Sequence, residues 1–536
     1  MLVNPETGHI ITDLMIIGGG VNGCGIARDA AGRGLSVTLV EMDDLGGATS
    51  SASTKLFHGG LRYLEYFKFR LVRESLIERE ILLCSMPHIS WPLRFVLPFD
   101  KSMRFDVLTP ATKWLNYMMP WLKSRRPFWL IRLGLFCYDT LGGRKILPPT
   151  KSLNIENSEE GAPLNAKFKR ALEYSDCWVE DSRLVILNAR DAQKRGATIL
   201  PRVKLIAAER GDKYWVLSLQ DQTTGKKWQQ DARYLVNAAG PWVQDILGEK
   251  LRLNVADSVR LVRGSHLVVK RLYEHDKAYF FQGKDGRIIF VIPYEQDFTL
   301  IGTTDVDHEL VHTKPICTDE EQKYLLKFAS EYFKNPIISD DIIWRYSGVR
   351  PLYEDGANAA ASATRDYVLK VDSSSAPIVT IFGGKITTYR KLAESSLSKI
   401  TPFFEIPDKP WTAHKSLPGG DFEVAEFPGL IEKLMQNYSY LSFEWARRLI
   451  RLYGTEAWDI LNNSKTASDL GKQFGCYITE QELSWSIRNE WTQNADDFLW
   501  RRTRLGLKLN DVEIKQIAHF IKHFKTQKTG SESPHK

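Results

Sequence analysis

The stretch Ile17-Gly18-Gly19-Gly20-Val21-Asn22-Gly23-Cys24-Gly25 decides the fold of this chain. The apolar run from Leu14 to Ile17 predicts a buried strand before it, and Ile26 to Ala31 predict a helix after it. Its G-x-G-x-x-G spacing allows a tight turn, close approach of a pyrophosphate and close packing of helix on strand. The helix N-terminus would add free N–H groups and a partial positive charge. The stretch therefore predicts the phosphate-binding turn of a dinucleotide site.

A second predicted strand, Ser36 to Val40, ends in Glu41. This carboxylate stands about 20 residues after the glycines, where a dinucleotide needs an acceptor for its ribose hydroxyls. A lone glycine motif is weak. Strand, glycines, helix, strand and terminal acid together favour a dinucleotide site over an ordinary glycine-rich turn.

Length and composition describe a folded protein of several domains. The chain has 536 residues, of which 43% are hydrophobic and 26% charged, so it can bury large cores. Its net charge of +7 suits an anionic ligand or an anionic membrane surface and is too small to indicate nucleic acid. The six cysteines lack metal-ligand spacing, so we expect reduced thiols in a cytoplasmic protein and no metal site.

The sequence also bears on export and membrane spanning. Residues 1–12 do not have the basic start and apolar core of a signal peptide, and no window holds eighteen uninterrupted apolar residues. We therefore expect no signal peptide and no spanning helix, so any membrane contact should be peripheral.

Two short segments follow the first unit. Residues 46–55 are mostly small or hydroxyl-bearing. They suit either a flexible linker or a loop lying against a cofactor, and their place after Glu41 favours the loop. His58 to Leu64 carry two glycines before Arg62, which predicts a tight turn that presents a guanidinium.

Residues 101–137 combine aromatic and basic side chains. Large apolar residues recur there at helical spacing: Trp114, Tyr117, Met118, Trp121 and Leu122. Lysines and arginines flank or interleave them, a pattern that suits a membrane interface. A helix packed on the protein's own core is the alternative, and Pro120 argues against one unbroken helix.

The strand-then-glycine pattern returns twice. Tyr234 to Asn237 predict a strand that enters Ala238-Ala239-Gly240, a junction of the kind that closes over a dinucleotide. Residues 376–384 predict another strand ending in two glycines, and Lys385 to Ala393 open a helix. The N-terminus of that helix can face an anion or a polarised carbonyl.

The remaining chain divides by composition. Residues 260–305 are predicted to be rich in β-strands, and residues 318–334 to be helical. A proline-rich stretch to Gly420 is a plausible linker, and the chain beyond it is mostly helical.

These residues resemble a known family. The segments Ile17–Gly34 and Gly383–Ala393 resemble the two signatures of FAD-dependent glycerol-3-phosphate dehydrogenase, in its aerobic, respiratory bacterial form. The resemblance covers about residues 12–520, although the segment 101–127 is longer than the family leads us to expect. The other matching motifs are His58-Gly-Gly-Leu-Arg-Tyr-Leu, Tyr174-Ser-Asp-Cys-Trp-Val, Gly264-Ser-His, Ile301-Gly-Thr-Thr-Asp, Tyr346-Ser-Gly-Val-Arg-Pro-Leu, Thr364-Arg-Asp-Tyr and Asp496-Asp-x-x-Trp-Arg-Arg-Thr.

The resemblance implies a reaction and a location. The reaction is oxidation of sn-glycerol 3-phosphate to dihydroxyacetone phosphate, with hydride transfer to FAD and electrons passed to a membrane quinone. The location is the cytoplasmic face of the cell membrane, held peripherally on an anionic surface, and the protein is expected to be a homodimer.

The resemblance also implies substrate residues. Fixed arginines suit a phosphate because their planar fork binds two oxygens. His266 is the candidate base, with Arg350 as its catalytic partner; the alternatives are a core histidine and an arginine–carboxylate pair that orients the hydroxyl. The substrate-binding residues implied are Arg62, Tyr63, Thr303, Arg350, Arg365 and Lys385.

For FAD the resemblance assigns the pyrophosphate to the first glycines and the ribose to Glu41. The last junction would meet the flavin end, where a helix N-terminus stabilises negative charge. The cofactor residues expected are Gly18, Gly19, Gly20, Gly23, Glu41, Thr49, Ser50, Ala239, Gly240, Gly384, Lys385, Ile386, Thr387 and Thr388.

The predicted architecture is α/β: a Rossmann-like FAD-binding domain with an interleaved β-rich substrate domain and an α-helical C-terminal domain. The FAD-binding segments are placed at 12–100, 151–242 and 356–405, the insert at 101–150, the substrate domain at 243–355 and the helical domain at 411–525.

Three other functions remain beside this one. A glycerol-3-phosphate oxidase would pass electrons to oxygen and make hydrogen peroxide, and a non-catalytic flavoprotein would bind without turnover. An NAD-dependent dehydrogenase is disfavoured, because the late glycine junction is what a flavin needs.

Overall fold

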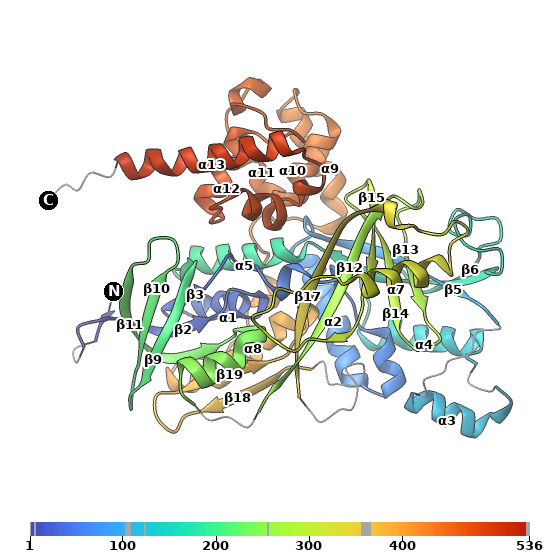
Figure 1. Cartoon of the computed structure of the whole chain (residues 1–536), viewed down its shortest axis with the longest axis horizontal. Helices are drawn as coiled ribbons and strands as arrows, with labels where there is room; N and C mark the ends of the chain where they lie inside the picture. The colour runs from blue at the N-terminus through green and yellow to red at the C-terminus, as the bar shows by residue number, and fades with distance from the viewer. Residues whose placement is uncertain are drawn as a thin grey trace.

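The computed structural model describes residues 2–4, 7–101, 109–122, 125–253, 257–354 and 366–531. Two β-sheets lie next to each other, and a helical C-terminal domain covers one end of both (Figure 1). The predicted fold class is confirmed.

The first sheet carries the dinucleotide unit. Its strands run in the order β18-β19-β11-β2-β3-β8, and β2 pairs in parallel with both β3 and β11. Parallel strands buried on both faces need continuous apolar runs, which is why Leu14 to Ile17 lack polar alternation. The strands are β1 (Leu2–Val3), β2 (Ile10–Ile17), β3 (Val37–Glu41), β8 (Thr198–Pro201), β9 (Val203–Arg210), β10 (Trp215–Asp221), β11 (Lys227–Asn237), β18 (Val368–Asp372) and β19 (Ile378–Phe382).

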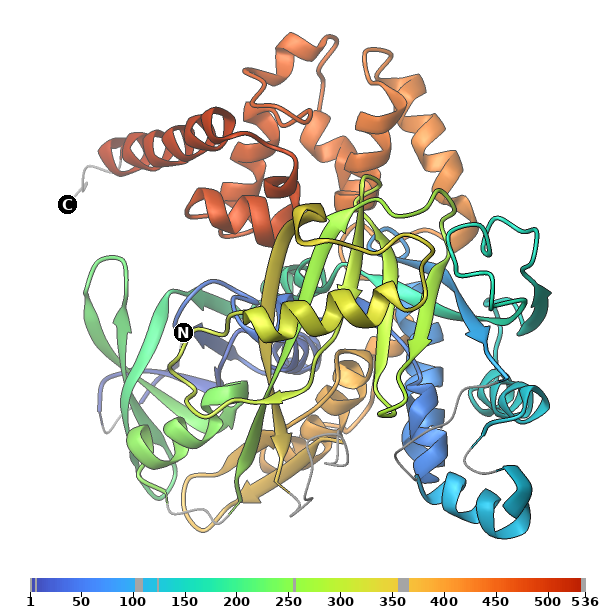
Figure 2. The same cartoon turned by 45° about the vertical axis from the view of Figure 1, so that its right-hand side comes forward.

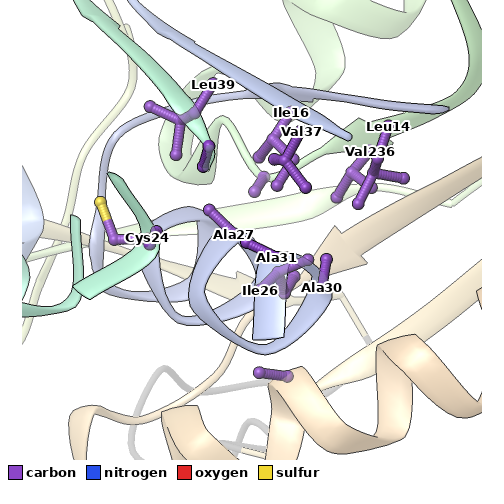
Figure 3. Close-up of a cluster of buried hydrophobic side chains, with 14 of the residues drawn as sticks. Leu14, Ile16, Cys24, Ile26, Ala27, Ala30, Ala31, Val37, Leu39 and Val236 are labelled. Carbon is purple, nitrogen blue, oxygen red and sulfur yellow. The ribbon is translucent and has the colours of Figure 1, made fainter. Parts of the chain in front are cut away.

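Three helices cover one face of this sheet: α1 (Val21–Gly32), α5 (Asp181–Lys194) and α8 (Tyr389–Ile400). Their small and branched residues form one buried cluster with the strands, drawn in part in Figure 3. Ala27, Ala30 and Ala31 let α1 lie close to β2 and β3, because alanine keeps the helix surface flat. The βαβ unit predicted for residues 13–41 is confirmed.

The second sheet is built around the long antiparallel pair of β12 and β17. Its main order is β16-β12-β15-β14-β13-β5-β7-β4, and the strands predicted within 260–305 are present. The strands are β4 (Leu56–Phe57), β5 (Ser90–Phe99), β6 (Lys151–Asn154), β7 (Arg170–Val179), β12 (Val259–Lys270), β13 (Ala278–Gln282), β14 (Ile288–Tyr294), β15 (Phe298–Gly302), β16 (Val306–Asp307) and β17 (Ile342–Tyr353).

The sheets do not follow the predicted segment boundaries. Strands β5 and β7 lie in the segments 12–100 and 151–242, which the sequence assigns to FAD binding, yet both belong to the second sheet. The parallel pairing of β13 with β5 carries the second sheet across to them. This pairing joins Phe95 to Ala278, 183 positions further along the chain, so local pattern does not show it.

The segment after β5 forms two exposed helices. Helix α3 (Pro110–Met118) ends before Pro120, as expected, and α4 (Phe128–Leu141) follows. Between them lies the short turn η3 (Pro120–Leu122). Helix α2 (Phe69–Ser85) precedes β5, and α7 (Asp319–Ser330) confirms the helix predicted over 318–334.

The C-terminal domain is helical, as predicted. Its two apolar clusters are separate from the sheets' cores, and it sits above α5 in Figure 1 and at the top of Figure 2. Among the described residues, no helix has both the length and the apolar character needed to cross a membrane. The main elements are α9 (Phe427–Asn437), α10 (Phe443–Tyr453), α11 (Ala457–Leu461), α12 (Glu480–Asn489), the π-helix η13 (Asp497–Arg502) and α13 (Asp511–Ser531).

Candidate active site

A cavity of about 890 Å³ opens between the two sheets. The loops that follow β2, β3, β11 and β19 form one side of it. These loops all leave the carboxyl ends of parallel strands, the usual ligand-binding edge of such a sheet. The second sheet closes the other side with residues of β12, β14 and β17.

The first glycine turn forms one end of the cavity. Gly18 has a φ of 110°, which favours glycine, and a Cβ there would lie 2.5 Å from the carbonyl oxygen of Ala238. A Cβ at Gly23 would lie 1.9 Å from the carbonyl oxygen of Gly18, so this glycine sets the close packing of α1 on the turn. Gly18 and Gly20 line the cavity, while Gly19 and Gly23 lie behind its wall.

Glu41 lines the same end, as the ribose assignment requires. Its carboxylate accepts hydrogen bonds from the amides of Gly19, at 2.7 Å, and Asp43, at 2.9 Å. Burial raises the pKa of Glu41 to about 6, although these two hydrogen bonds act to lower it.

Asn22 is a cavity residue that sequence reasoning missed. Its Nδ2 donates to the carbonyl oxygen of Gly383 at 3.4 Å and thereby joins the first and last glycine junctions. Its Oδ1 is buried without a hydrogen-bond partner among the described residues. The signal was its place inside the first glycine turn, where a polar side chain must face either solvent or ligand.

The last glycine junction also lines the cavity. Gly383 and Gly384 have φ values of 74° and 108°, so both glycines are needed for the turn into the helix. Lys385 Nζ lies 4.0 Å from the ring centroid of Tyr63. The predicted cofactor residues Gly384 to Thr387 line the cavity, whereas Thr388 is buried behind them.

The remaining predicted cofactor residues also meet the cavity. Thr49 and Ser50 line it, and the hydroxyl of Ser50 accepts a hydrogen bond from the amide of Val21 at 3.0 Å. Ala239 and Gly240 line it from the loop after β11. The segment 46–55 is therefore a wall of the cavity rather than a free linker.

A cationic group faces this wall from the second sheet. Arg350 lines the cavity, pairs with Asp305 and donates to Thr303 Oγ1 at 3.0 Å. A Cβ on Gly264 would lie 2.3 Å from Arg350 Nη2, so this glycine makes room for the guanidinium. Arg350 and Asp305 thus form an arginine–carboxylate pair, the arrangement that could orient the substrate hydroxyl in place of a histidine base.

The other predicted substrate residues are placed as follows. Arg62 and Tyr63 line the cavity from the short helix η2 (Leu61–Tyr66). Thr303 and Lys385 line it as well. Arg365 lies outside the described residues.

His266 differs from expectation, because it lies behind the cavity wall. It is 1% exposed, its Nε2 lies 2.9 Å from Thr54 Oγ1, and its ring stacks on Tyr346 at 4.8 Å. Thr54 itself lines the cavity. Burial, followed by the charges of Arg350 and Lys55, lowers the pKa of His266 well below its usual value, so the imidazole is neutral at neutral pH.

A buried network holds the loop that leads to Arg62. Tyr138 of α4 accepts a hydrogen bond from the amide of Gly59 at 2.7 Å and donates to Asp176 at 2.8 Å. Arg79 of α2 pairs with the same carboxylate at 2.7 Å. Burial raises the pKa of Asp176 to about 6 despite these partners.

The geometry fits FAD. The cavity is lined by a glycine turn with a helix N-terminus, by the acid Glu41 and by the cations Arg62, Arg350 and Lys385. Such an extended site, with backbone kept bare by glycines, suits a dinucleotide pyrophosphate. The buried, unpartnered Oδ1 of Asn22 on its wall is an acceptor that a ligand would satisfy.

One set of side chains at the cavity mouth resembles a metal site. Asp245, Glu249 and His312 bring possible ligand atoms within 4.8 Å of one another. Glu249 and His312 are exposed, and His312 Nε2 pairs with Asp245 at 3.1 Å.

Comparison with known proteins identifies relatives that depend on FAD. The family model of FAD-dependent oxidoreductases matches residues 13–390, and that of the C-terminal domain of alpha-glycerophosphate oxidase matches residues 411–529. The chain is 42% identical to the aerobic glycerol-3-phosphate dehydrogenase of Escherichia coli over 96% of this chain and 98% of that protein. It is also 42% identical to the D-erythritol 1-phosphate dehydrogenase of Brucella abortus, over 96% of this chain and 97% of that protein.

A solved structure supports the fold and the cofactor. The glycerol-3-phosphate dehydrogenase of Bacillus halodurans, complexed with FAD, superposes with a TM-score of 0.70 at 25% identity, over 96% of this chain and 94% of that chain. With the family models and the cavity, these findings place the chain in the FAD-dependent oxidoreductase family, as a flavoenzyme that carries the C-terminal domain of alpha-glycerophosphate oxidase.

Proposed function

We propose that the protein oxidises sn-glycerol 3-phosphate to dihydroxyacetone phosphate. The observation that carries the proposal is that three cations, Arg62, Arg350 and Lys385, line the same cavity as the glycine turns. A phosphate dianion suits these three cations, and the hydroxyl of Thr303 on the same wall can hydrogen-bond a secondary alcohol. The relative in Escherichia coli named for this activity supports the same substrate.

The reaction removes a hydride from C2 and a proton from the C2 hydroxyl. Bound FAD supplies the hydride acceptor. Of the protein groups, Arg350 is held rigid by Asp305, so it can orient the substrate oxygens without reorganising. Neutral His266 can accept the hydroxyl proton through the hydroxyl of Thr54, which lies between it and the cavity.

For the electron acceptor we propose a membrane quinone. Exposed aromatic and aliphatic side chains gather on α3 and α4 and beside the cavity, on Phe67 and Phe69. Exposed basic residues lie among them, a mixture that suits an anionic membrane surface. The side chains of this surface, called the aromatic patch below, are Trp114, Tyr117, Met118, Trp121, Trp129, Leu133 and Phe136.

We propose that the aromatic patch holds the protein peripherally on the cytoplasmic face of the membrane. The cavity wall includes residues 66–70, and two of these, Phe67 and Phe69, are exposed. A membrane docked on this side would therefore lie close to the cavity. The predicted homodimer belongs to the same proposal, and sedimentation of the FAD-loaded protein measures it directly.

Two neighbouring functions give different products. The oxidase alternative passes electrons to oxygen, and a D-erythritol 1-phosphate dehydrogenase, suggested by the equally similar Brucella abortus relative, acts on a longer polyol phosphate. We favour the three-carbon substrate and the quinone.

The test is a balance of products with FAD-loaded protein on anionic vesicles. Dihydroxyacetone phosphate should form in step with reduction of an added ubiquinone analogue, with little hydrogen peroxide. Equal turnover and stoichiometric peroxide without quinone would establish the oxidase, and no keto product from sn-glycerol 3-phosphate would refute the substrate.

A further inference from the structure

The motif at Asp496 to Thr503 takes no part in the site as described so far. It belongs to the C-terminal domain, where it forms η13 and the turn that follows. Two arginine side chains of this segment, Arg502 and Arg504, cross to the FAD-binding part. There Arg502 pairs with the buried carboxylate of Asp44, and Arg504 with that of Asp181. Among the described residues, only the carboxylate bound by Arg504 is also bonded to the loop 51–55 of the cavity wall.

Arg504 ends on Asp181, the first residue of α5. Its Nη2 donates to Asp181 Oδ1 at 2.6 Å, to Ser182 Oγ at 3.1 Å and to the carbonyl oxygen of Ser51 at 3.2 Å. Arg504 is 5% exposed and Asp181 is fully buried. The contact is therefore an internal joint between domains rather than a surface ion pair.

Asp181 is also tied to the cavity wall. Its Oδ2 accepts from the amide of Ser53 at 3.1 Å and from the hydroxyl of Ser53 at 2.8 Å, and its Oδ1 accepts from Lys55 Nζ at 2.8 Å. Lys55 has a φ of 61°, a conformation that costs a non-glycine residue about 1 kcal/mol or more and persists only where contacts enforce it. Asp181 thus fixes the bend of the loop 51–55.

That loop reaches the proposed base from two sides. The carbonyl oxygen of Ser53 accepts a hydrogen bond from the hydroxyl of Tyr346 at 2.9 Å, and the ring of Tyr346 stacks on His266 with an angle of 10°. The next residue, Thr54, lies 2.9 Å from His266 Nε2. A shift of the loop would move both the plane and the hydrogen-bond partner of His266.

We infer that Arg504 of the C-terminal domain is a positioning residue, which acts through Asp181 and the loop 51–55 to hold Thr54 and His266 in place for proton removal. The C-terminal helical domain therefore helps to position the groups that remove the substrate proton. The inference rests on the proposed role of His266, but its structural half, the fixing of the loop, stands independently of the substrate.

Arg502 supplies a matched control. It is fully buried, donates to Asp44 at 2.9 Å and to the carbonyl oxygen of Glu490, and comes from the same short segment. Asp44 lies outside the loop 51–55. Arg502→Lys therefore weakens a buried ion pair between the C-terminal domain and the FAD-binding part, but it leaves the contacts of the loop 51–55 with His266 intact.

The experiment compares Arg504→Lys with Arg502→Lys in full-length, FAD-loaded protein. Hydrogen exchange of the amides in 51–55 is measured by mass spectrometry, and flavin reduction by sn-glycerol 3-phosphate is followed by stopped flow. Arg504→Lys should speed exchange in 51–55 about tenfold and lower the limiting reduction rate about tenfold, with the apparent Kd for substrate within about twofold. Arg502→Lys should leave both quantities at their wild-type values.

A second variant avoids the C-terminal domain altogether. Ser53→Ala removes the hydroxyl bond to Asp181 and should reproduce the slower reduction and faster exchange. Equal effects of the two arginine variants, or a Ser53→Ala protein with wild-type exchange and rate, would overturn the inference. Absence of flavin reduction in the wild-type protein would instead refute the proposed substrate, and the exchange comparison would still decide whether Arg504 holds the loop.

Discussion

Two helical regions flank the sheets of this protein, and they are attached in opposite ways. The aromatic patch on α3 and α4 leaves large apolar side chains in solvent, with Tyr117 83% exposed and Trp121 71% exposed. The C-terminal domain buries its own aromatics, such as Trp445, and fastens to the sheets through buried ion pairs. The outer faces of α3 and α4 therefore present a surface, although Tyr138 of α4 is buried beside the site, whereas the C-terminal domain reaches the site through buried charges.

The largest effect expected concerns the buried joint. Asp181→Asn leaves the cations of Lys55 and Arg504 without their buried counter-charge, so unfolding free energy should fall by about 3–5 kcal/mol, measured by chemical denaturation. Burial would raise the pKa of Asp181, but Lys55 and Arg504 together hold it below its usual value. The stabilisation is therefore present above about pH 4 and is lost as the pH falls through the lowered pKa.

Asp307→Asn is the control for that variant. Asp307 is 58% exposed and pairs with Arg260 on the surface, so its loss should change the unfolding free energy by at most about 1 kcal/mol. Similar losses of unfolding free energy for Asp181→Asn and Asp307→Asn would contradict the claim that buried ion pairs fasten the C-terminal domain more strongly than a surface pair.

A smaller effect is expected at the aromatic patch. Replacing Trp114 and Trp121 together by serine should weaken binding to anionic phospholipid vesicles about tenfold or more, a change of about 1.4 kcal/mol, and leave unfolding free energy almost unchanged. Co-sedimentation with vesicles measures the first quantity. Phe443→Ser, at an exposed position of the C-terminal domain, serves as the control and should bind vesicles normally.

The charges on that patch give an effect of similar size, which depends on salt. Lys113 and Arg132 are exposed there, and a basic residue near an anionic surface contributes about 1 kcal/mol. Replacing both by glutamine should weaken binding to anionic vesicles and flatten its response to added salt. Vesicles of neutral lipid should distinguish the variant little from the wild type; an equal loss on neutral lipid would mean that these residues act through the fold.

The smallest effect lies at the glycine end of the cavity, which neither helical region forms. Burial raises the pKa of Glu41 to about 6, and the ionised carboxylate is the better acceptor for ribose hydroxyls. FAD affinity of the apoprotein should therefore fall as the pH drops below about 6, by at most about tenfold per pH unit. Glu41→Gln should remove this dependence in a fluorescence titration; an unchanged pH profile would exclude Glu41 as its source.

Local pattern in the sequence predicts the glycine junctions but not the sheet partners. The strand, glycines and helix around Gly18 lie within thirty residues, and so do those around Gly383, so both junctions follow from the order of residues alone. The membership of β5 and β7 in the second sheet does not, because pairing across long separations leaves no periodic trace.

The same limit applies inside the site. Arg350 can be proposed from its motif, whereas Asp305 closes another motif with nothing in the sequence to pair the two. The position of His266 behind Thr54 depends on how two distant strands and a loop pack together. The joint of Ser53, Asp181 and Arg504 brings together three segments far apart in the chain, which only the fold reveals.

The most direct test mixes the FAD-loaded protein with sn-glycerol 3-phosphate in the absence of oxygen and follows the visible absorbance of the flavin. We predict prompt bleaching by sn-glycerol 3-phosphate, slower bleaching by D-erythritol 1-phosphate and recovery of the colour when a quinone is added. A flavin that stays oxidised with sn-glycerol 3-phosphate would contradict the proposed function, and faster bleaching by D-erythritol 1-phosphate would reassign the substrate to the longer polyol phosphate.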